Sequence, residues 1–129
     1  MIKFTLFDYT DKNGKNDIKE WTLGLEKRDR AKLNLKLDML ALQGSELFPQ
    51  VLTNTPTAGI LKLRVKGNVQ LRPMLCKGPI NIEKEFTLLI GATERDSHFV
   101  PDKADEKAND RKKLIIENPN RRCLHERIS

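Results

Sequence analysis

The chain has 129 residues, of which 38% are hydrophobic and 33% are charged, and its formal net charge is +6. A chain of this length can bury one modest hydrophobic core and has little room for a second domain. It contains no run of about 18 apolar residues that could cross a membrane, and its first residues reach Asp8 before any long apolar stretch develops, unlike a signal peptide.

The first strand and the first helix are predicted near the start of the chain. Residues 2–7 place Ile2, Phe4 and Leu6 at alternate positions, which predicts a strand with one apolar face. The polar segment 11–15 ends this strand. Asn16 or Asp17 can then cap a short helix that carries apolar residues at roughly helical spacing.

A second helix is predicted over residues 26–43. Part of this stretch alternates apolar and polar residues as a strand would, but it has no β-branched residue and is rich in good helix formers. As a helix it has a wide apolar surface, expected to pack against a sheet, with Leu33, Leu37, Leu40 and Ala41 on one side and Leu35, Met39 and Leu42 on another. Gly44 is predicted to end it.

Residues 45–59 predict a loop, and residues 60–75 predict a β-hairpin. A three-residue loop at 66–68 places Val65 opposite Val69, and Leu63 opposite Leu71, on one face of the hairpin. The other face then gathers the polar and basic side chains Lys62, Arg64, Gln70 and Arg72. Pro73 has no backbone N–H, so the second strand should carry a bulge or an unpaired position there.

The rest of the chain predicts a loop over 76–83, a strand over 85–91 and a helix that begins near Pro101 and ends at about Glu117. The inward side chains are expected to be Phe86, Leu88 and Ile90 in the strand and Ala104, Ala108 and Ile115 in the helix. We therefore expect one α+β domain over 1–118, in the order strand, two helices, three-stranded meander and C-terminal helix, with a loosely held polar tail over 119–129.

The two cysteines, Cys76 and Cys123, lack the CxxC or Cys/His spacing that zinc sites use. A disulfide between them is one alternative that the sequence leaves undecided, although nothing in the pattern requires one. We therefore expect a protein of the reducing cytoplasm that needs no metal and no other cofactor. The sequence also lacks a phosphate-binding glycine loop and a convincing Ser/His/Asp arrangement, which argues against a kinase or a triad hydrolase.

The excess positive charge lies in one segment. Residues 47–82 contain no Asp or Glu, while five bases fall there, namely Lys62, Arg64, Lys66, Arg72 and Lys77. Such a stretch is typical of nucleic-acid binding, although alternating bases on a strand are often only a solvated surface. Because Phe48 is the one aromatic residue in the segment, contact with phosphates is better supported than base stacking.

The order of elements and several short motifs resemble the RelE/ParE superfamily, and most of all its HigB-like toxins. The motifs are Gly59-Ile-Leu-Lys-Leu-Arg-Val, Val69-Gln-Leu-Arg72, Phe86-Thr-Leu-Leu-Ile-Gly91, and Pro101 followed by Ala108 and Arg111. The resemblance implies a RelE-like antiparallel sheet. It also implies a ribosome-dependent mRNA endoribonuclease, in which the 2′-hydroxyl attacks the adjacent phosphate, held silent by a cognate helix-turn-helix antitoxin.

The candidate catalytic and RNA-binding residues lie in the basic segment and in the turn before the last helix. Arg64 and Arg72 match the family's basic strand positions and are the expected stabilisers of charge on the phosphate. His98 precedes the last helix and is the candidate acid or base, although a lone loop histidine is more often a surface residue. The residues expected to bind RNA are Lys62, Lys66, Gln70, Lys77 and Arg95.

One segment departs from the family pattern. HigB-like proteins usually continue the last strand as Gly-Phe and a lysine-rich run, whereas this chain has Gly91-Ala-Thr-Glu94-Arg95-Asp96. The two acids favour an alternative, a non-catalytic and phage-type relative that binds RNA or a protein. A ParE-like gyrase inhibitor is a further alternative. Glu94 as a base and His125 as a catalytic group near the C-terminus are weaker hypotheses than surface roles for both.

Overall fold

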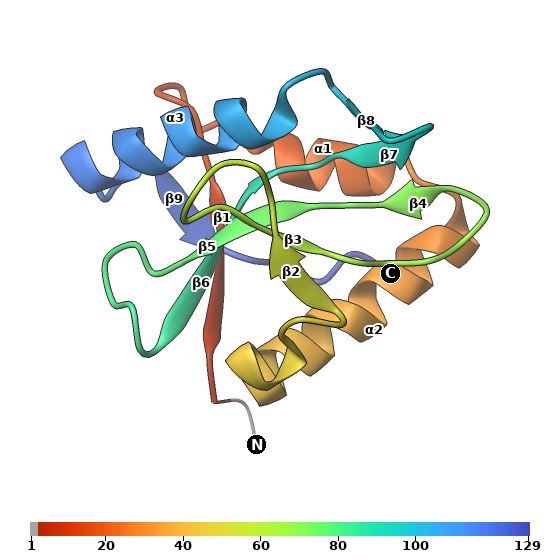
Figure 1. Ribbon diagram of the computed structural model, residues 1–129. Helices are drawn as coiled ribbons and strands as arrows, with labels where there is room; N and C mark the ends of the chain where they lie inside the picture. The colour runs from red at the N-terminus through yellow and green to blue at the C-terminus, as the bar shows by residue number, and fades with distance from the viewer. Residues whose placement is uncertain (1–2) are drawn as a thin grey trace.

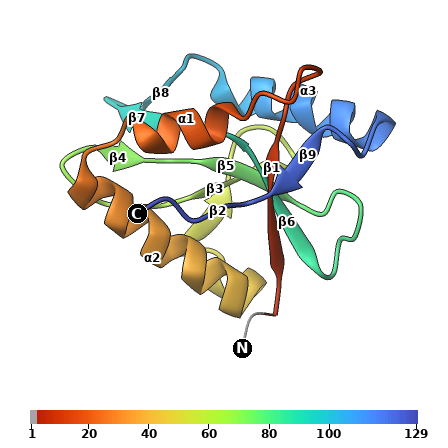
Figure 2. The same ribbon diagram turned by 180° about the vertical axis from the view of Figure 1, so that it is seen from behind.

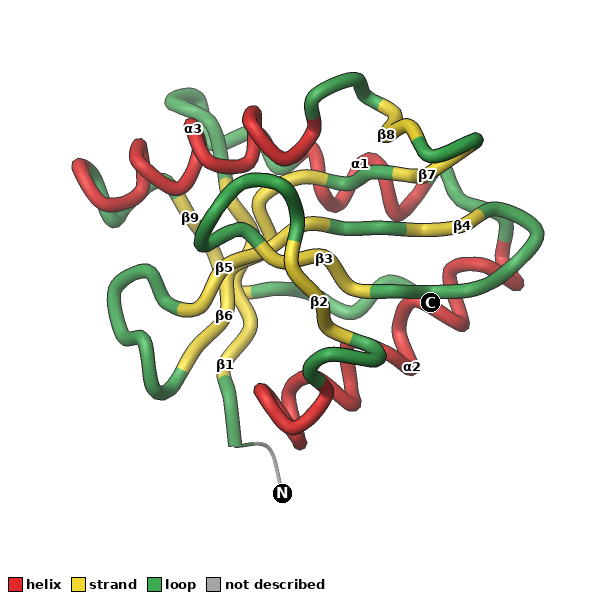
Figure 3. Tube along the Cα trace, in the orientation of Figure 1, coloured by secondary structure: helices red, strands yellow, loops and turns green. Residues whose placement is uncertain are grey.

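The computed structural model describes residues 3–129, so Ile2 of the first predicted strand lies outside the described residues. Those residues form an α+β protein, with the helices α1 (Asp17–Leu23), α2 (Lys27–Gln43) and α3 (Ala104–Glu117) and the short 3-10 helix η1 (Gly44–Leu47) (Figure 1). The strands, coloured yellow in Figure 3, are β1 (Thr5–Tyr9), β2 (Leu52–Asn54), β3 (Leu61–Leu63), β4 (Gln70–Leu71), β5 (Met74–Lys77), β6 (Glu85–Ile90), β7 (Thr93–Arg95), β8 (His98–Val100) and β9 (Arg122–Leu124).

Two sheets organise the molecule. The larger sheet has the strand order β2-β3-β5-β6-β1-β9, and the smaller has the order β4-β7-β8. The pair β1 and β6 is parallel and the other pairs are antiparallel, so the large sheet is mixed and not purely antiparallel as expected. Helix α3 lies in front of this sheet in Figure 1, and α1 and α2 come to the front when the molecule is turned in Figure 2. The predicted order of strand, two helices, strands and helix is confirmed in outline, but β2 to β8 stand where a three-stranded meander was predicted, and β9 follows α3.

Helix α2 buries one of its two predicted apolar sides. Leu33, Leu37 and Leu40 belong to the core, as expected. The second side is covered only in part, because Met39 packs against the core while Leu35 is 59% exposed and Leu42 is 44% exposed. At the end of α2, Gly44 has φ 56° and a Cβ at this position would meet the ring of Phe4, so the predicted helix stop is confirmed.

The predicted hairpin has the right faces and the wrong register. Val65 is bridged to Leu71 and not to Val69, which leaves a longer loop and exposes 37% of Val69. Because this register differs by two residues from the predicted one, Leu63, Val65 and Leu71 still share the buried face. The interruption expected at Pro73 is confirmed, since β4 ends before it and β5 begins after it.

The remaining boundaries differ modestly from the prediction. The segment predicted as one loop over 45–59 contains η1 and β2, and Cys76 lies in β5. Strand β6 is buried on both faces and not on one alone. Helix α3 begins at Ala104, later than Pro101, and buries the three predicted side chains Ala104, Ala108 and Ile115.

The polar tail is part of the fold, contrary to the prediction that it is loosely held. Residues 122–124 form β9, an edge strand antiparallel to β1. Beyond it, the backbone N–H of His125 donates to the Leu6 carbonyl, and the Asn34 side chain donates to the Ile128 carbonyl at 2.7 Å. None of the helices within residues 3–129 has both the length and the apolar character needed to cross a bilayer.

Candidate functional site

A carboxylate and two cations meet where the two sheets adjoin. The Oε1 atom of Glu94, on β7, lies 3.1 Å from Nε of Arg72 and 3.5 Å from Nζ of Lys62. Within residues 3–129, no group donates a hydrogen bond to the other carboxylate oxygen, Oε2 of Glu94. We call these three residues the Glu94 cluster.

The break at Pro73 creates this arrangement. Strand β4, just before the proline, belongs to the smaller sheet, and β5, just after it, belongs to the larger one. The pairing of β4 with β7 places Gln70 opposite Glu94. Arg72 is only 9% exposed, and its guanidinium donates to the Leu71 carbonyl at 2.8 Å and to the Gln70 side chain at 3.2 Å. The guanidinium is therefore fixed before any ligand arrives, which favours stabilisation of a developing negative charge.

The hairpin of β7 and β8 supplies Glu94 and places Phe99 beside the cluster. Glu94 pairs with Phe99, and paired residues of antiparallel strands point to the same face. The ammonium of Lys62 accordingly lies 5.1 Å from the centre of the Phe99 ring, within the range of a cation–π contact. The turn residues Asp96 and Ser97 both have positive φ angles, as a tight two-residue hairpin turn requires.

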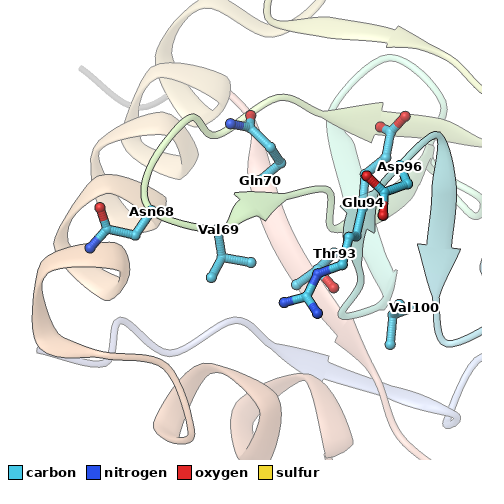
Figure 4. A pocket seen from close by; sticks show the side chains of 8 residues that line it. Asn68, Val69, Gln70, Thr93, Glu94, Asp96 and Val100 are labelled. Carbon is cyan, nitrogen blue, oxygen red and sulfur yellow. The ribbon is translucent and has the colours of Figure 1, made fainter.

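His98 does not join the cluster. It pairs with Arg95, so both side chains point to the face of the hairpin opposite to Glu94. A hollow of about 410 Å³ beside the hairpin is lined by Gln70 and Glu94 together with Val69, Thr93 and Val100, and His98 is not among its lining residues (Figure 4). His98 is exposed on the edge strand β8, and the expected acid or base is therefore not placed beside Arg72.

The predicted basic face is divided between two places. Lys62, Gln70 and Arg72 come together at the Glu94 cluster, as the alternation of the strands predicts. Arg64 and Lys66 instead line a second hollow, beside α2, of about 370 Å³. Lys77 pairs with Phe86 near the start of β6, at the opposite end of that strand from Ile90, and so lies away from the cluster.

A second pair of ionisable groups was missed by sequence reasoning. Asp8, on β1, is 1% exposed, and its carboxylate lies 2.9 Å from Nδ1 of His125 and accepts a hydrogen bond from the Asn16 side chain at 2.9 Å. The available signal was a charged residue inside an apolar strand, because a buried carboxylate needs partners. These contacts attach the tail to β1.

Arg111, which carries part of the family resemblance, has a structural role. Its guanidinium donates to both carboxylate oxygens of Asp17, at 2.9 and 2.7 Å, and to the Leu89 carbonyl. It also lies 4.8 Å from the centre of the Tyr9 ring. These contacts join α3 to α1 and to the sheet.

Residues 3–129 contain no group of three or more His, Cys, Asp or Glu side chains that could hold a metal ion. A likeness of fold would not settle the activity in any case, because one fold can serve many reactions. No protein-family model, no curated protein and no solved structure matches this chain.

Proposed function

We propose that this protein is a HigB/RelE-like toxin that cuts RNA at the Glu94 cluster. The observation that carries the proposal is one carboxylate between two cations, with Oε2 left open, in a strongly basic protein. Self-cleavage of an RNA phosphodiester needs a base for the 2′-hydroxyl and positive charge for the phosphate. The cluster offers both within hydrogen-bonding reach of each other.

The proposed reaction uses all three members of the cluster. Glu94 accepts the proton of the 2′-hydroxyl, and the oxygen attacks the adjacent phosphorus. Arg72 and Lys62 stabilise the charge on the phosphate oxygens, and Arg72 keeps its hydrogen bond to the Leu71 carbonyl meanwhile. The 5′-oxygen leaves with a proton from Lys62 or from water, which gives a 2′,3′-cyclic phosphate and a 5′-hydroxyl.

The remaining parts of the proposal rest on the family resemblance. The substrate is mRNA on the ribosome, and the regulator is a cognate helix-turn-helix antitoxin. Gln70 borders the cluster, since its side chain accepts a hydrogen bond from Arg72, and it is an RNA-binding candidate beside Lys62. Arg95 follows Glu94 on β7 but points to the opposite face of the hairpin. A basic protein with a net charge of +6 is suited to approach a polyanion of this kind.

The test is induced expression in bacteria of the wild type, Arg72→Ala and Glu94→Gln, with growth and mRNA 5′ ends recorded together. We expect arrest and new cuts in the wild type and a loss of both in the two variants. Glu117→Gln, on the exposed end of α3, is the matched control for the loss of one carboxylate and should behave as the wild type. Circular dichroism must show that all variants are folded.

Persistent cuts in both variants would rule out the Glu94 cluster as the reaction centre. Arrest without cuts in the wild type would indicate a gyrase-type target. Normal growth with intact mRNA would favour the second candidate, a non-catalytic RNA-binding module. One observation supports that candidate, namely that Glu94 already neutralises much of the charge of Arg72 and Lys62.

A further inference from the structure

One side of α2 carries apolar residues that the described structure covers only in part. Leu35 and Leu42 are exposed, Met39 is partly buried, and the three follow one another at helical spacing. Such a stripe on a surface helix is unusual, because a helix normally turns its apolar positions toward the core. Exposed apolar patches with polar rims are typical of interaction sites.

Positive charge borders this stripe. The hollow of about 370 Å³ beside Leu35 is lined by the apolar residues Val51 and Val65 and by four cations, Lys32, Lys36, Arg64 and Lys66. No salt bridge within residues 3–129 involves any of these four side chains. We call the stripe and the hollow together the docking face.

The two acids of α2, Asp29 and Asp38, form no salt bridge with the four cations of the docking face. Asp38 is paired with Arg127. Asp29 is buried, and its Oδ1 atom lies against Gly67, where an added Cβ would come within 2.6 Å of it. The four cations therefore remain available to an acidic partner.

We propose that the docking face binds an acidic, amphipathic helix of a partner protein. An apolar side of such a helix would cover Leu35 and Leu42 and fill the hollow, and its acidic residues would pair with Lys32 and Lys36. This inference concerns a surface apart from the Glu94 cluster and does not depend on RNA cleavage.

Two other occupants fit the docking face less well. An RNA backbone would satisfy the cations, but its phosphates have no apolar surface to cover the two leucines. A second copy in a twofold dimer would place the face against itself, so that Lys32 and Lys36 would meet their own like charges. An amphipathic acidic helix can cover the exposed leucines with its apolar side and pair its acids with the cations of the docking face.

The experiment is a selection of helical peptides from a displayed library against the wild-type protein. We expect enriched peptides with acidic residues and with apolar residues at i, i+3 or i+4, and i+7. For a synthesised enriched peptide, fluorescence anisotropy should show binding weakened about tenfold or more by Lys32→Glu/Lys36→Glu and by Leu35→Ala. The control Lys12→Glu/Lys84→Glu changes the net charge equally at exposed positions and should bind as the wild type.

Peptides that lack acids, or that bind the charge-reversed variant equally well, would overturn the proposal. So would a single-stranded RNA probe that loses affinity in Lys32→Glu/Lys36→Glu while no peptide is enriched. A wild-type dimer in sedimentation that Leu35→Glu dissociates would show a self-interface instead. RNA cleavage by the same samples is scored separately, so absent cleavage with intact peptide binding counts against the Glu94 cluster alone.

Discussion

At the scale of single residues, the two cysteines differ because one is buried and the other is exposed. Burial raises the pKa of the Cys76 thiol from 9.0 to about 12. Partial burial, followed by the negative charge of Asp8, also raises the pKa of Cys123, but this thiol stays accessible. Since the thiolate is the reactive form, neither cysteine is an activated nucleophile.

We expect a thiol reagent at pH 8 to label one cysteine in the native protein and two in urea. Peptide mapping should place the native label on Cys123.

The raised pKa of Cys76 also predicts a loss of stability at high pH. The unfolded thiol ionises near its ordinary value of 9.0 and the folded thiol only near 12, so the contribution of Cys76 is full below pH 9 and is lost as the pH rises toward 12.

Urea unfolding at pH 8 and pH 10.5 measures how the free energy of unfolding changes with pH. The control Cys76→Ala lacks the thiol, so its free energy of unfolding should change less between the two pH values. Rapid native labelling of Cys76, or an equal pH dependence in Cys76→Ala, would contradict the assignment.

The residues of the Glu94 cluster could be predicted only in part. Lys62, Gln70 and Arg72 follow from strand alternation, because side chains two apart share a face. For Glu94 the sequence favours a surface role over a role as a base. Its place beside Arg72 depends on the pairing of β4 with β7, which the spacing of residues along the chain does not encode. His98 was misplaced for the same reason, since the register of β7 and β8 decides its face.

At the scale of elements, alternation determined the faces of the hairpin and left its register open. A shift of two residues keeps every side chain on its face, so Val65 could pair with Leu71 without any change in the apolar pattern. Composition correctly identified α2 as a helix but could not show how much of its surface would be covered. That depends on the width of the sheet beneath it.

Strand β9 yields a prediction for the tail. His125→Ala should destabilise the protein by about 1–3 kcal/mol, because Asp8 is buried and would keep only its bond from Asn16. Arg127→Ala is the matched change in the same tail. Its ion pair with Asp38 is exposed, so we expect a loss of about 0–1 kcal/mol.

Urea unfolding followed by the fluorescence of Trp21, the single tryptophan, measures both changes. Equal and small effects would mean that the tail does not anchor to Asp8.

At the scale of the whole molecule, the α+β class and the order of helices and strands could be predicted, whereas three long-range pairings could not. These are the parallel pair of β1 and β6, the smaller sheet, and the return of the tail to β1. Each joins segments far apart in the chain, and local propensity carries no information about such partners. The same pairings divide the basic segment between the Glu94 cluster and the docking face.

This division of charge predicts opposite effects of one substitution on RNA binding and RNA cleavage. Glu94→Gln removes the carboxylate that occupies Arg72 and Lys62, so both cations become available to phosphates. We expect the variant to bind a single-stranded RNA more tightly than the wild type does, and to lose cleavage. Each additional phosphate contact should steepen the dependence of log affinity on log salt concentration by about 0.7, so two contacts should add about 1.4.

Affinities of the wild type and Glu94→Gln measured at several salt concentrations, beside Glu117→Gln, give the comparison. Because Glu117→Gln changes the net charge equally but lies away from the cluster, a general effect of charge would appear in both variants. A slope that steepens only in Glu94→Gln would show that Arg72 and Lys62 contact phosphates when the carboxylate is gone. A slope and an affinity that both stay unchanged would mean that RNA does not reach the cluster, and the proposed reaction centre would then have to be abandoned.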